Sequence, residues 1–323
     1  MKTLSYVMTS LLFIFGVPTW CAGVGYPEKP ITMIVPFTTG GANDLDARAV
    51  APLLEESLKQ AVVVVNKAGA NTLLGGNAVA TAKPDGYTIG GAFSVIASLP
   101  ETFNYFQKSP YTSNDLTPIC LMTRSSGVLI VKSDSQWKNM KEFVEYARKS
   151  PGAKIGSHGG PGSIPNLMLM EIEKAENIKF SIVPMEGNAA NMTAVLGGHL
   201  PIAVSNFATV RQQVEAKNLR VLLFLTDSRS ELMPEVQCAK DIGYDLPAIP
   251  FSGYFGPKNL PHEITEKINN ALKNIAHDPR YKKTAESLGL EIVYEGPESF
   301  KKTLLQYRKK LEEFYRKLGF WKD

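Results

Sequence analysis

Short apolar runs alternate along the chain with segments in which apolar residues recur at helical spacing. The runs predict strands at Ile31–Val35, Val62–Asn66, Tyr87–Phe93, Val128–Lys132, Lys154–Ser157, Phe180–Pro184, Ile202–Ser205 and Arg220–Thr226. Most of the segments between them have the apolar stripe of an amphipathic helix. Repeated strand–helix–strand units predict an α/β protein whose sheets are mostly parallel and flanked by helices.

A Gly-rich turn follows the first predicted strand and opens a helix. Such a turn directs backbone N–H groups to one point, and a helix N-terminus adds roughly half a positive charge. This arrangement holds anions without a cationic side chain, so we expect a small carboxylate there. The alternative is a plain strand–helix connection that needs glycine. The candidate ligand-binding residues are Phe37, Thr38, Thr39, Gly40, Gly41, Asn43 and Asp44.

Two members of this turn have a structural alternative. Asp44 is suited to cap the helix or to stand as a first-turn acid, because beside a bound anion it would repel it. Phe37 is either a core residue or an apolar wall against the carbon chain of the ligand.

A second Gly-rich turn lies roughly a hundred residues further on, again between a strand and a helix. Two such turns in different halves predict two lobes with a ligand between them, because α/β sheets bind ligands beyond the carboxyl ends of their strands. The candidates here are Ser157, His158, Gly160, Gly162 and Ser163.

The two turns do not match the motifs of known enzymes. Ser157 and His158 are adjacent on an extended segment, so their side chains point to opposite sides, and no nucleophile elbow surrounds the serine. The glycines at 40 and 41 are adjacent, which departs from the dinucleotide fingerprint of an oxidoreductase. The histidines lie in separate segments without ligand spacing. We expect no cofactor, no metal and no catalysis.

The first residues predict an export signal at 1–23. Lys2 is followed by an apolar stretch, Leu4 to Val17, that is too short to span a bilayer. Trp20 next to Cys21 argues against a lipidated cysteine, and the cleavage site is best placed at Gly23. The mature chain is therefore expected to be soluble and periplasmic. A formal charge of +4 gives no reason to expect nucleic acid.

The mature chain keeps two cysteines, Cys120 and Cys238, which are far apart in the sequence. Two cysteines do not make a disulfide framework. Buried free thiols are the expected state, with a single long-range bridge as the alternative.

Several motifs occur in an order and spacing that resemble one family from about Tyr26 to the C-terminus. They are Tyr26–Ile31, Ile34–Phe37, Gly40–Gly41 with Asp44 and Arg48, Val64–Asn66, Gly69–Ala70, Ala82–Thr88, Asp115–Ile119, Gly159–Ser163, Val183–Pro184 with Gly187, and Leu196–Gly198. The chain resembles the tripartite tricarboxylate transporter receptors, also called Bug proteins.

This resemblance implies an extracytoplasmic solute-binding protein with the two-lobed type II periplasmic fold. Lobe 1 would comprise residues 24–124 and 250–323, and lobe 2 residues 125–249, with crossing strands near Leu121–Ser125 and Ile249–Gly253. The protein is expected to act as a monomer that delivers a carboxylate to membrane transporter subunits. The resemblance also places Ser94, Met185 and Asn206 at the ligand.

Some positions depart from the family pattern. Met185 stands where an aromatic residue is usual, Asn206 replaces a usual aspartate, and Pro165–Leu167 replaces a Ser-His-Leu triplet. These changes affect the choice of ligand rather than the fold. The sequence does not name the carboxylate. It also leaves open sensing through a membrane kinase, and a regulatory effector domain is disfavoured by the export signal and the missing helix-turn-helix.

Overall fold

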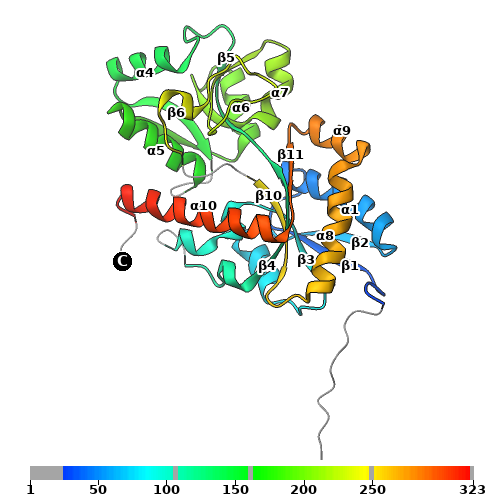
Figure 1. The fold of residues 1–323 in the computed structure, drawn as a ribbon. Helices are drawn as coiled ribbons and strands as arrows, with labels where there is room; N and C mark the ends of the chain where they lie inside the picture. The colour runs from blue at the N-terminus through cyan, green and yellow to red at the C-terminus, as the bar shows by residue number, and fades with distance from the viewer. Residues whose placement is uncertain (1–24, 105–107, 159–162, 247–250, 321–323) are drawn as a thin grey trace, which may run out of the picture.

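Two β-sheets, each flanked by helices, form the framework of the protein (Figure 1). The computed structural model describes residues 25–104, 108–158, 163–246 and 251–320. We call the first sheet and its helices lobe 1, and the second sheet and its helices lobe 2. The expected α/β architecture is confirmed.

The six-stranded sheet of lobe 1 has the order β11-β4-β10-β3-β1-β2. Its strands are β1 (Ile31–Val35), β2 (Val62–Asn66), β3 (Thr88–Phe93), β4 (Leu116–Arg124), β10 (Phe251–Pro257) and β11 (Glu291–Glu295). The five-stranded sheet of lobe 2 has the order β7-β6-β8-β5-β9. Its strands are β5 (Gly127–Lys132), β6 (Ala153–His158), β7 (Phe180–Met185), β8 (Ala203–Asn206) and β9 (Leu219–Phe224).

Helices connect and cover these strands. The α-helices of the described residues are α1 (Ala42–Leu58), α2 (Leu73–Ala80), α3 (Val95–Ser98), α4 (Met140–Lys149), α5 (Ile164–Glu176), α6 (Asn188–Leu196), α7 (Phe207–Glu215), α8 (His262–His277), α9 (Pro279–Ser287) and α10 (Pro297–Lys317). Short 3₁₀ helices lie at Pro100–Phe103, Ser113–Asp115 and Ala239–Ile242.

The expectation of mostly parallel sheets was wrong in detail, because both sheets are mixed. β1 pairs in parallel with β2 and β3, and β6 with β7 and β8. In contrast, β10 runs antiparallel to β3 and β4, and β5 runs antiparallel to β8 and β9. The antiparallel strands β4, β5 and β10 adjoin the passages between the sheets. The chain leaves lobe 1 after β4, enters lobe 2 at β5 and returns to lobe 1 at β10, so no helical crossover within one sheet imposes a parallel direction there.

The chain passes between the lobes just after β4. That strand ends in the first sheet at Arg124, and β5 begins in the second sheet at Gly127. The backbone N–H of Phe207 donates to the Ser126 carbonyl at 2.8 Å, which ties the start of α7 to this passage. The return passage precedes β10, and residues 247–250 lie outside the described ranges. The expected crossing near Leu121–Ser125 agrees with the first passage.

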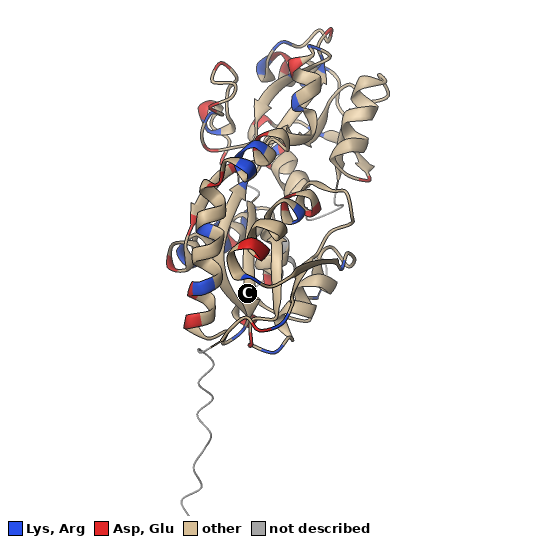
Figure 2. Ribbon diagram, turned by 90° about the vertical axis from the view of Figure 1, so that its right-hand side faces the viewer, with Lys and Arg blue, Asp and Glu red and all other residues tan. Residues whose placement is uncertain are grey.

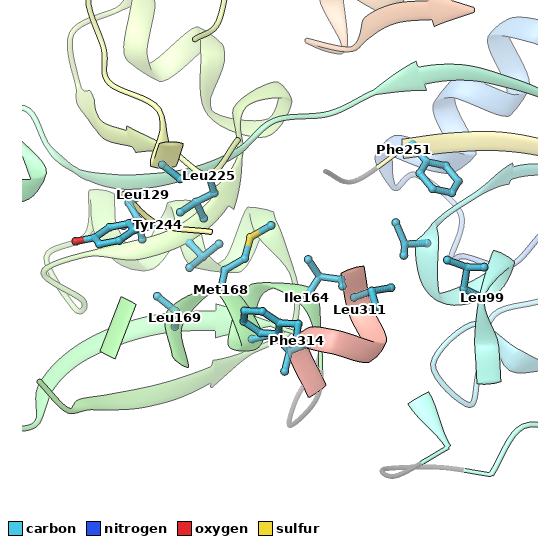
Figure 3. Close-up of a cluster of buried hydrophobic side chains, with 14 of the residues drawn as sticks. Leu99, Leu129, Ile164, Met168, Leu169, Leu225, Tyr244, Phe251, Leu311 and Phe314 are labelled. Atoms are coloured by element: carbon cyan, nitrogen blue, oxygen red, sulfur yellow. The ribbon is translucent and has the colours of Figure 1, made fainter. Parts of the chain in front are cut away.

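One apolar cluster extends through both lobes along α10 (Figure 3). Phe251 of β10 belongs to it, as do Met168 of α5 and both Leu311 and Phe314 of α10. At the lobe 1 end, the Phe251 and Phe300 rings lie 5.5 Å apart in an edge arrangement. Burying each such side chain contributes about 1.5–3 kcal/mol, so α10 is a strong additional connection between the lobes.

Candidate functional site

The first Gly-rich turn is built by close packing and by one left-handed residue. Gly40 has φ +83°, a conformation that side chains rarely adopt, and Gly41 follows as the residue before α1. Behind the turn, a Cβ on Gly75 of α2 would lie 2.8 Å from the Pro36 Cα. The absence of that side chain lets α2 pack directly beneath the turn.

A network of polar side chains fixes this turn from within. The Asp44 carboxylate accepts from the Gly40 N–H at 2.8 Å and from the Asn66 amide at 2.8 Å. Arg48 Nε donates to the same carboxylate at 3.0 Å, and its Nη2 donates to the Asn66 Oδ1 at 2.9 Å. The Asn66 amide also donates to the Phe37 carbonyl at 3.0 Å. The network therefore joins the ends of β1 and β2 to the first turn of α1.

Asp44 is ionised in this network. Burial acts to raise the pKa of its carboxyl, but the Gly40 N–H, Arg48 and Asn66 outweigh it and lower the pKa below its usual value. Its side chain is only 1% exposed, so Asp44 serves here to organise the turn. This agrees with the structural alternative for this residue.

The remaining predicted residues of the turn surround this network. The Gly40 N–H is occupied by Asp44, whereas the N–H groups of Thr38, Thr39 and Asn43 make no hydrogen bond within the described ranges. Thr38, Thr39 and Gly40 are exposed. Three of the donors foreseen for an anion are thus present. Phe37 is half-buried and packs on the lobe 1 core, in line with the first of its two alternatives.

Asn43 and Ser94 connect the turn to β3. The Asn43 amide donates to the Ala92 carbonyl at 2.9 Å, and Ser94 follows two residues later at the end of the strand. The Ser94 Oγ is buried and has no hydrogen-bond partner among the described residues. The structure thus brings Ser94 to the same sheet edge as the turn, because β1 and β3 are parallel neighbours.

In lobe 2, the described part of the second turn is its two ends. Ser157 and His158 close β6, and Ser163 directly precedes α5. The Ser163 hydroxyl donates to the His158 carbonyl at 2.8 Å, which fixes the base of the turn. Gly160 and Gly162 lie outside the described residues.

His158 is a neutral group in this setting. Burial lowers the pKa of its imidazole, and its Nδ1 lies 3.5 Å from the Asn191 amide nitrogen. At neutral pH its side chain is thus a polar neutral group rather than a cation.

Met185 and Asn206 lie at the ends of neighbouring strands in lobe 2. Met185 pairs with His158 in the β6–β7 register, and Asn206 closes β8 opposite Gly127. Asn206 therefore lies beside the passage between the lobes. Both residues are half-buried. The register places the predicted lobe 2 residues along one sheet edge.

Buried polar atoms without partners gather at these strand ends. Within the described residues, such atoms include Ser94 Oγ in lobe 1 and Ser157 Oγ, Asn188 Oδ1, Asn191 Oδ1 and Asn206 Oδ1 in lobe 2. Leaving a buried polar group unpaired costs about 1–3 kcal/mol, so such a concentration is typical of a surface that a ligand completes.

Asn66, Asn188 and Asn191 were not among the residues predicted from the sequence. Asn66 ends β2, and Asn188 follows Gly187 directly after β7, so both occupy carboxyl ends of parallel strands. That position is the signal that points to them. Asn191 lies inside α6 and reaches the Val204 carbonyl at 2.8 Å across the sheet, which no sequence pattern indicates.

Other kinds of site find little support. In the part of the chain that the structure describes, no group of His, Cys, Asp and Glu is arranged to hold a metal ion. Cys120 and Cys238 are free and buried, as expected. Acidic and basic residues are interspersed on the helices, and the strands are largely uncharged (Figure 2). Among the described helices, none has the length and apolar composition needed to span a membrane.

A surface depression of about 650 Å³ lies on the outer side of lobe 2, away from both turns. It is lined by residues of α4 and α5 and by the end of α10. Three of its four basic side chains, Arg148, Lys179 and Lys317, pair with Glu176, Glu173 and Glu171. The fourth, Lys174, donates to the Lys317 carbonyl. Ion pairs thus neutralise most of the charge of this depression, and we place the candidate site at the strand ends.

Comparison with known proteins decides the family. The profile of the tripartite tricarboxylate transporter family receptor matches residues 47–320. The chain belongs to this family. A UPF0065 protein from the gbd 5′ region of Cupriavidus necator is 29% identical over 316 residues, which cover 97% of this chain and 95% of the relative.

Solved structures support the family and its fold. The periplasmic binding protein BugD superposes with a TM-score of 0.77 and 26% identity, covering 92% of this chain and 100% of BugD. MatC from Rhodopseudomonas palustris, solved with bound malate, gives a TM-score of 0.76 at 21% identity and covers 90% of this chain and 99% of MatC. This receptor therefore has the periplasmic binding protein fold. Because the family consists of solute-binding receptors, the receptor is not an enzyme.

Proposed function

We propose that this receptor captures a small carboxylate between its two lobes in the periplasm. It then delivers the carboxylate to the membrane subunits of a tripartite tricarboxylate-type transporter. Residues 1–23 act as the export signal, and the receptor works as a monomer. The malate-bound relative supports the fold alone at its level of identity, so the ligand class rests on the chemistry of the strand ends.

The proposal is carried by the different polar groups that the two lobes have at the carboxyl ends of their strands. Lobe 1 offers N–H donors at Thr38, Thr39 and Asn43 around the N-terminus of α1. Lobe 2 offers buried polar side chains without partners at Ser157, Asn188 and Asn206. The first set suits an anion, and the second completes its hydrogen bonds to the polar groups at the other end of the ligand.

Hydrogen bonds alone can supply the binding free energy of a micromolar ligand, without a contact from Arg or Lys. Each hydrogen bond to a charged group contributes roughly 1.5–3 kcal/mol. A micromolar dissociation constant requires only about 8 kcal/mol. Four such bonds at the upper end of that range give about 12 kcal/mol, which leaves about 8 kcal/mol after an association cost of about 4 kcal/mol. An affinity of this order suits capture followed by release.

A thermal-shift screen of the mature protein tests the proposal. The ligands are small mono-, di- and tricarboxylates, aromatic acids and amino acids, each paired with the neutral amide of the same acid. A ligand that binds only the native state raises the melting temperature. We expect a rise with one group of acids and none with their amides. Shifts with amides or neutral solutes, and none with any acid, would contradict the carboxylate assignment.

Calorimetry on one variant then places the ligand. Thr39→Pro removes a backbone donor from the first turn, and we expect much weaker binding of the acid found in the screen while the fold is kept. Unchanged affinity would show that the carboxylate does not bind at this turn.

A further inference from the structure

A second acidic residue of α1 is buried completely within lobe 1. Asp46 follows Asp44 by two positions, and it is 1% exposed among the apolar residues of the core. Asp44 and Asp46 differ in their partners, because Asp44 binds the Gly-rich turn whereas Asp46 binds residues on distant elements. Helix α1 therefore has one carboxylate facing the turn and another facing the centre of the lobe.

The hydroxyl groups around Asp46 come from three other elements. Tyr281 of α9 donates to Oδ1 at 2.6 Å, and Ser252 of β10 donates to Oδ2 at 2.8 Å. Thr123 of β4 lies near enough to help lower the pKa of the carboxyl, although its hydroxyl has no partner in hydrogen-bond geometry within the described residues. The carboxylate thus holds β10 directly through Ser252, and Ser252 pairs in register with Thr123 of β4, so both strands that adjoin the passages between the lobes are involved.

Ser252 and Thr123 lie next to the two passages of the chain between the lobes. They are register partners on adjacent strands. Thr123 is the second-last residue of β4 before the chain leaves for lobe 2, and Ser252 is the second residue of β10 after it returns. A group that holds Ser252 therefore holds β10 directly and β4 through its pairing with β10, at the points where the chain leaves lobe 1 and returns to it.

We propose that Asp46 is a positioning residue that sets the resting angle between the two lobes. It does so by linking α1, whose N-terminus forms the binding turn, to β4 and β10 together. A shift of the binding turn is then transmitted along one turn of helix to both connecting strands. The proposal concerns the ligand-free protein, so it goes beyond the proposed function and stands whether or not the ligand is a carboxylate.

The electrostatics support a specific role over simple packing. Burial raises the pKa of Asp46, while the Tyr281, Ser252 and Thr123 hydroxyls act to lower it. The other titratable groups facing it are Cys120 and Tyr254, and burial raises the pKa of both, so they stay neutral at physiological pH. An apolar side chain of similar size would fill this space without the cost of burying a carboxyl. The hydrogen bonds to separate elements are what the carboxyl adds.

Interlobe distances measured in the ligand-free protein test this proposal. Spin labels at Glu145→Cys on α4 and Glu263→Cys on α8 report the separation, because both positions are exposed and the native cysteines are buried. The test variants are Asp46→Asn, which keeps the shape of the side chain, and Ser252→Ala, which deletes one hydroxyl. We expect both to displace and broaden the distance distribution.

Tyr281→Phe is the matched control. It also removes one donor to Asp46, but from α9, which is not a connecting strand. We expect it to lower the melting temperature by a few degrees and to leave the interlobe distances unchanged. An unaltered distribution in folded Asp46→Asn and Ser252→Ala would overturn the proposal. So would an equal change in Tyr281→Phe, since Asp46 would then act only on the stability of the core.

Discussion

The two strand-to-helix turns of this receptor are satisfied in different ways. In lobe 1, Asp44, Arg48 and Asn66 bind one another and the turn backbone, so the turn has its shape before any ligand arrives. In lobe 2, the Ser157 Oγ and the Asn206 Oδ1 are buried atoms that have no partner among the described residues. The comparison teaches that the lobe 1 side is organised in advance by charged side chains, whereas the lobe 2 side is neutral and keeps polar atoms that the proposed ligand would pair.

Removing the central carboxylate of lobe 1 gives the largest expected effect. Asp44→Ala leaves the Gly40 N–H and Arg48 without their partner, so we expect the free energy of unfolding to fall by about 2 kcal/mol and ligand affinity to fall with it. Chemical denaturation and calorimetry measure the two losses. The control is Asp134→Ala, which breaks only an exposed pair with Lys132 at 3.3 Å. Equal losses in both variants would remove the distinction.

Adding a charge to the neutral side is the next test. Asn206→Asp brings a carboxylate to the lobe 2 edge beside the passage between the lobes, so we expect at least a tenfold loss of affinity for an acid, about 1.4 kcal/mol. Asn218→Asp adds the same charge at an exposed position of lobe 2 and should have little effect, because salt screens distant charges. Calorimetry on both variants decides between a local and a general charge effect.

Deleting an unpartnered hydroxyl separates binding from stability. Ser157→Ala removes a buried group with no partner in the described structure, so we expect a raised melting temperature of the ligand-free protein and a loss of binding of about 1 kcal/mol. Ser163→Ala removes the hydrogen bond to the His158 carbonyl, and it should lower the melting temperature as well. A loss of stability in Ser157→Ala would mean that the lobe 2 edge is also satisfied internally.

The smallest expected effect is a pH dependence that belongs to lobe 1. The folded pKa of Asp44 lies below its usual value of 3.8, so its ionised form stabilises the protein above that value. This contribution is lost as the pH falls through the folded pKa. We therefore expect the stability gap between the wild type and Asp44→Asn to narrow in acid. Denaturation at a series of pH values from neutral downward measures that gap, and a constant gap would contradict the assignment.

Local patterns allowed the sequence to predict much of the framework. The run Val62–Val65 is entirely apolar and Ile31–Val35 is apolar except for Thr32, and both strands form as expected. Strands β4, β10 and β11 did not appear in the strand pattern. Pro118 interrupts β4, and β10 contains Gly253, where a Cβ would lie 2.6 Å from the Phe300 ring. That glycine is explained by the packing of α10, which is absent from any local window.

The two turns of the candidate site could be predicted from the sequence, but the hydrogen-bond networks around them could not. The Gly-rich segments identified both strand ends. The bond between Asn66 and Asp44 depends on the register of β1 with β2, so it requires the folded sheet. Asp46 was equally inaccessible, because its partners Ser252 and Tyr281 lie more than two hundred residues away. Long-range pairing of polar side chains leaves no periodic signal in a sequence.

Helix α10 has a consequence for how the chain completes its fold during synthesis. Its residues Leu311 and Phe314 leave the ribosome after all the other described helices and strands, yet they belong to the apolar cluster that includes Met168 of α5 and Phe251 of β10. A nascent or truncated chain that ends before Pro297 therefore presents apolar surface on both lobes at once. Such species are prone to aggregate, so chaperones should bind the unfinished chain in preference to the complete one.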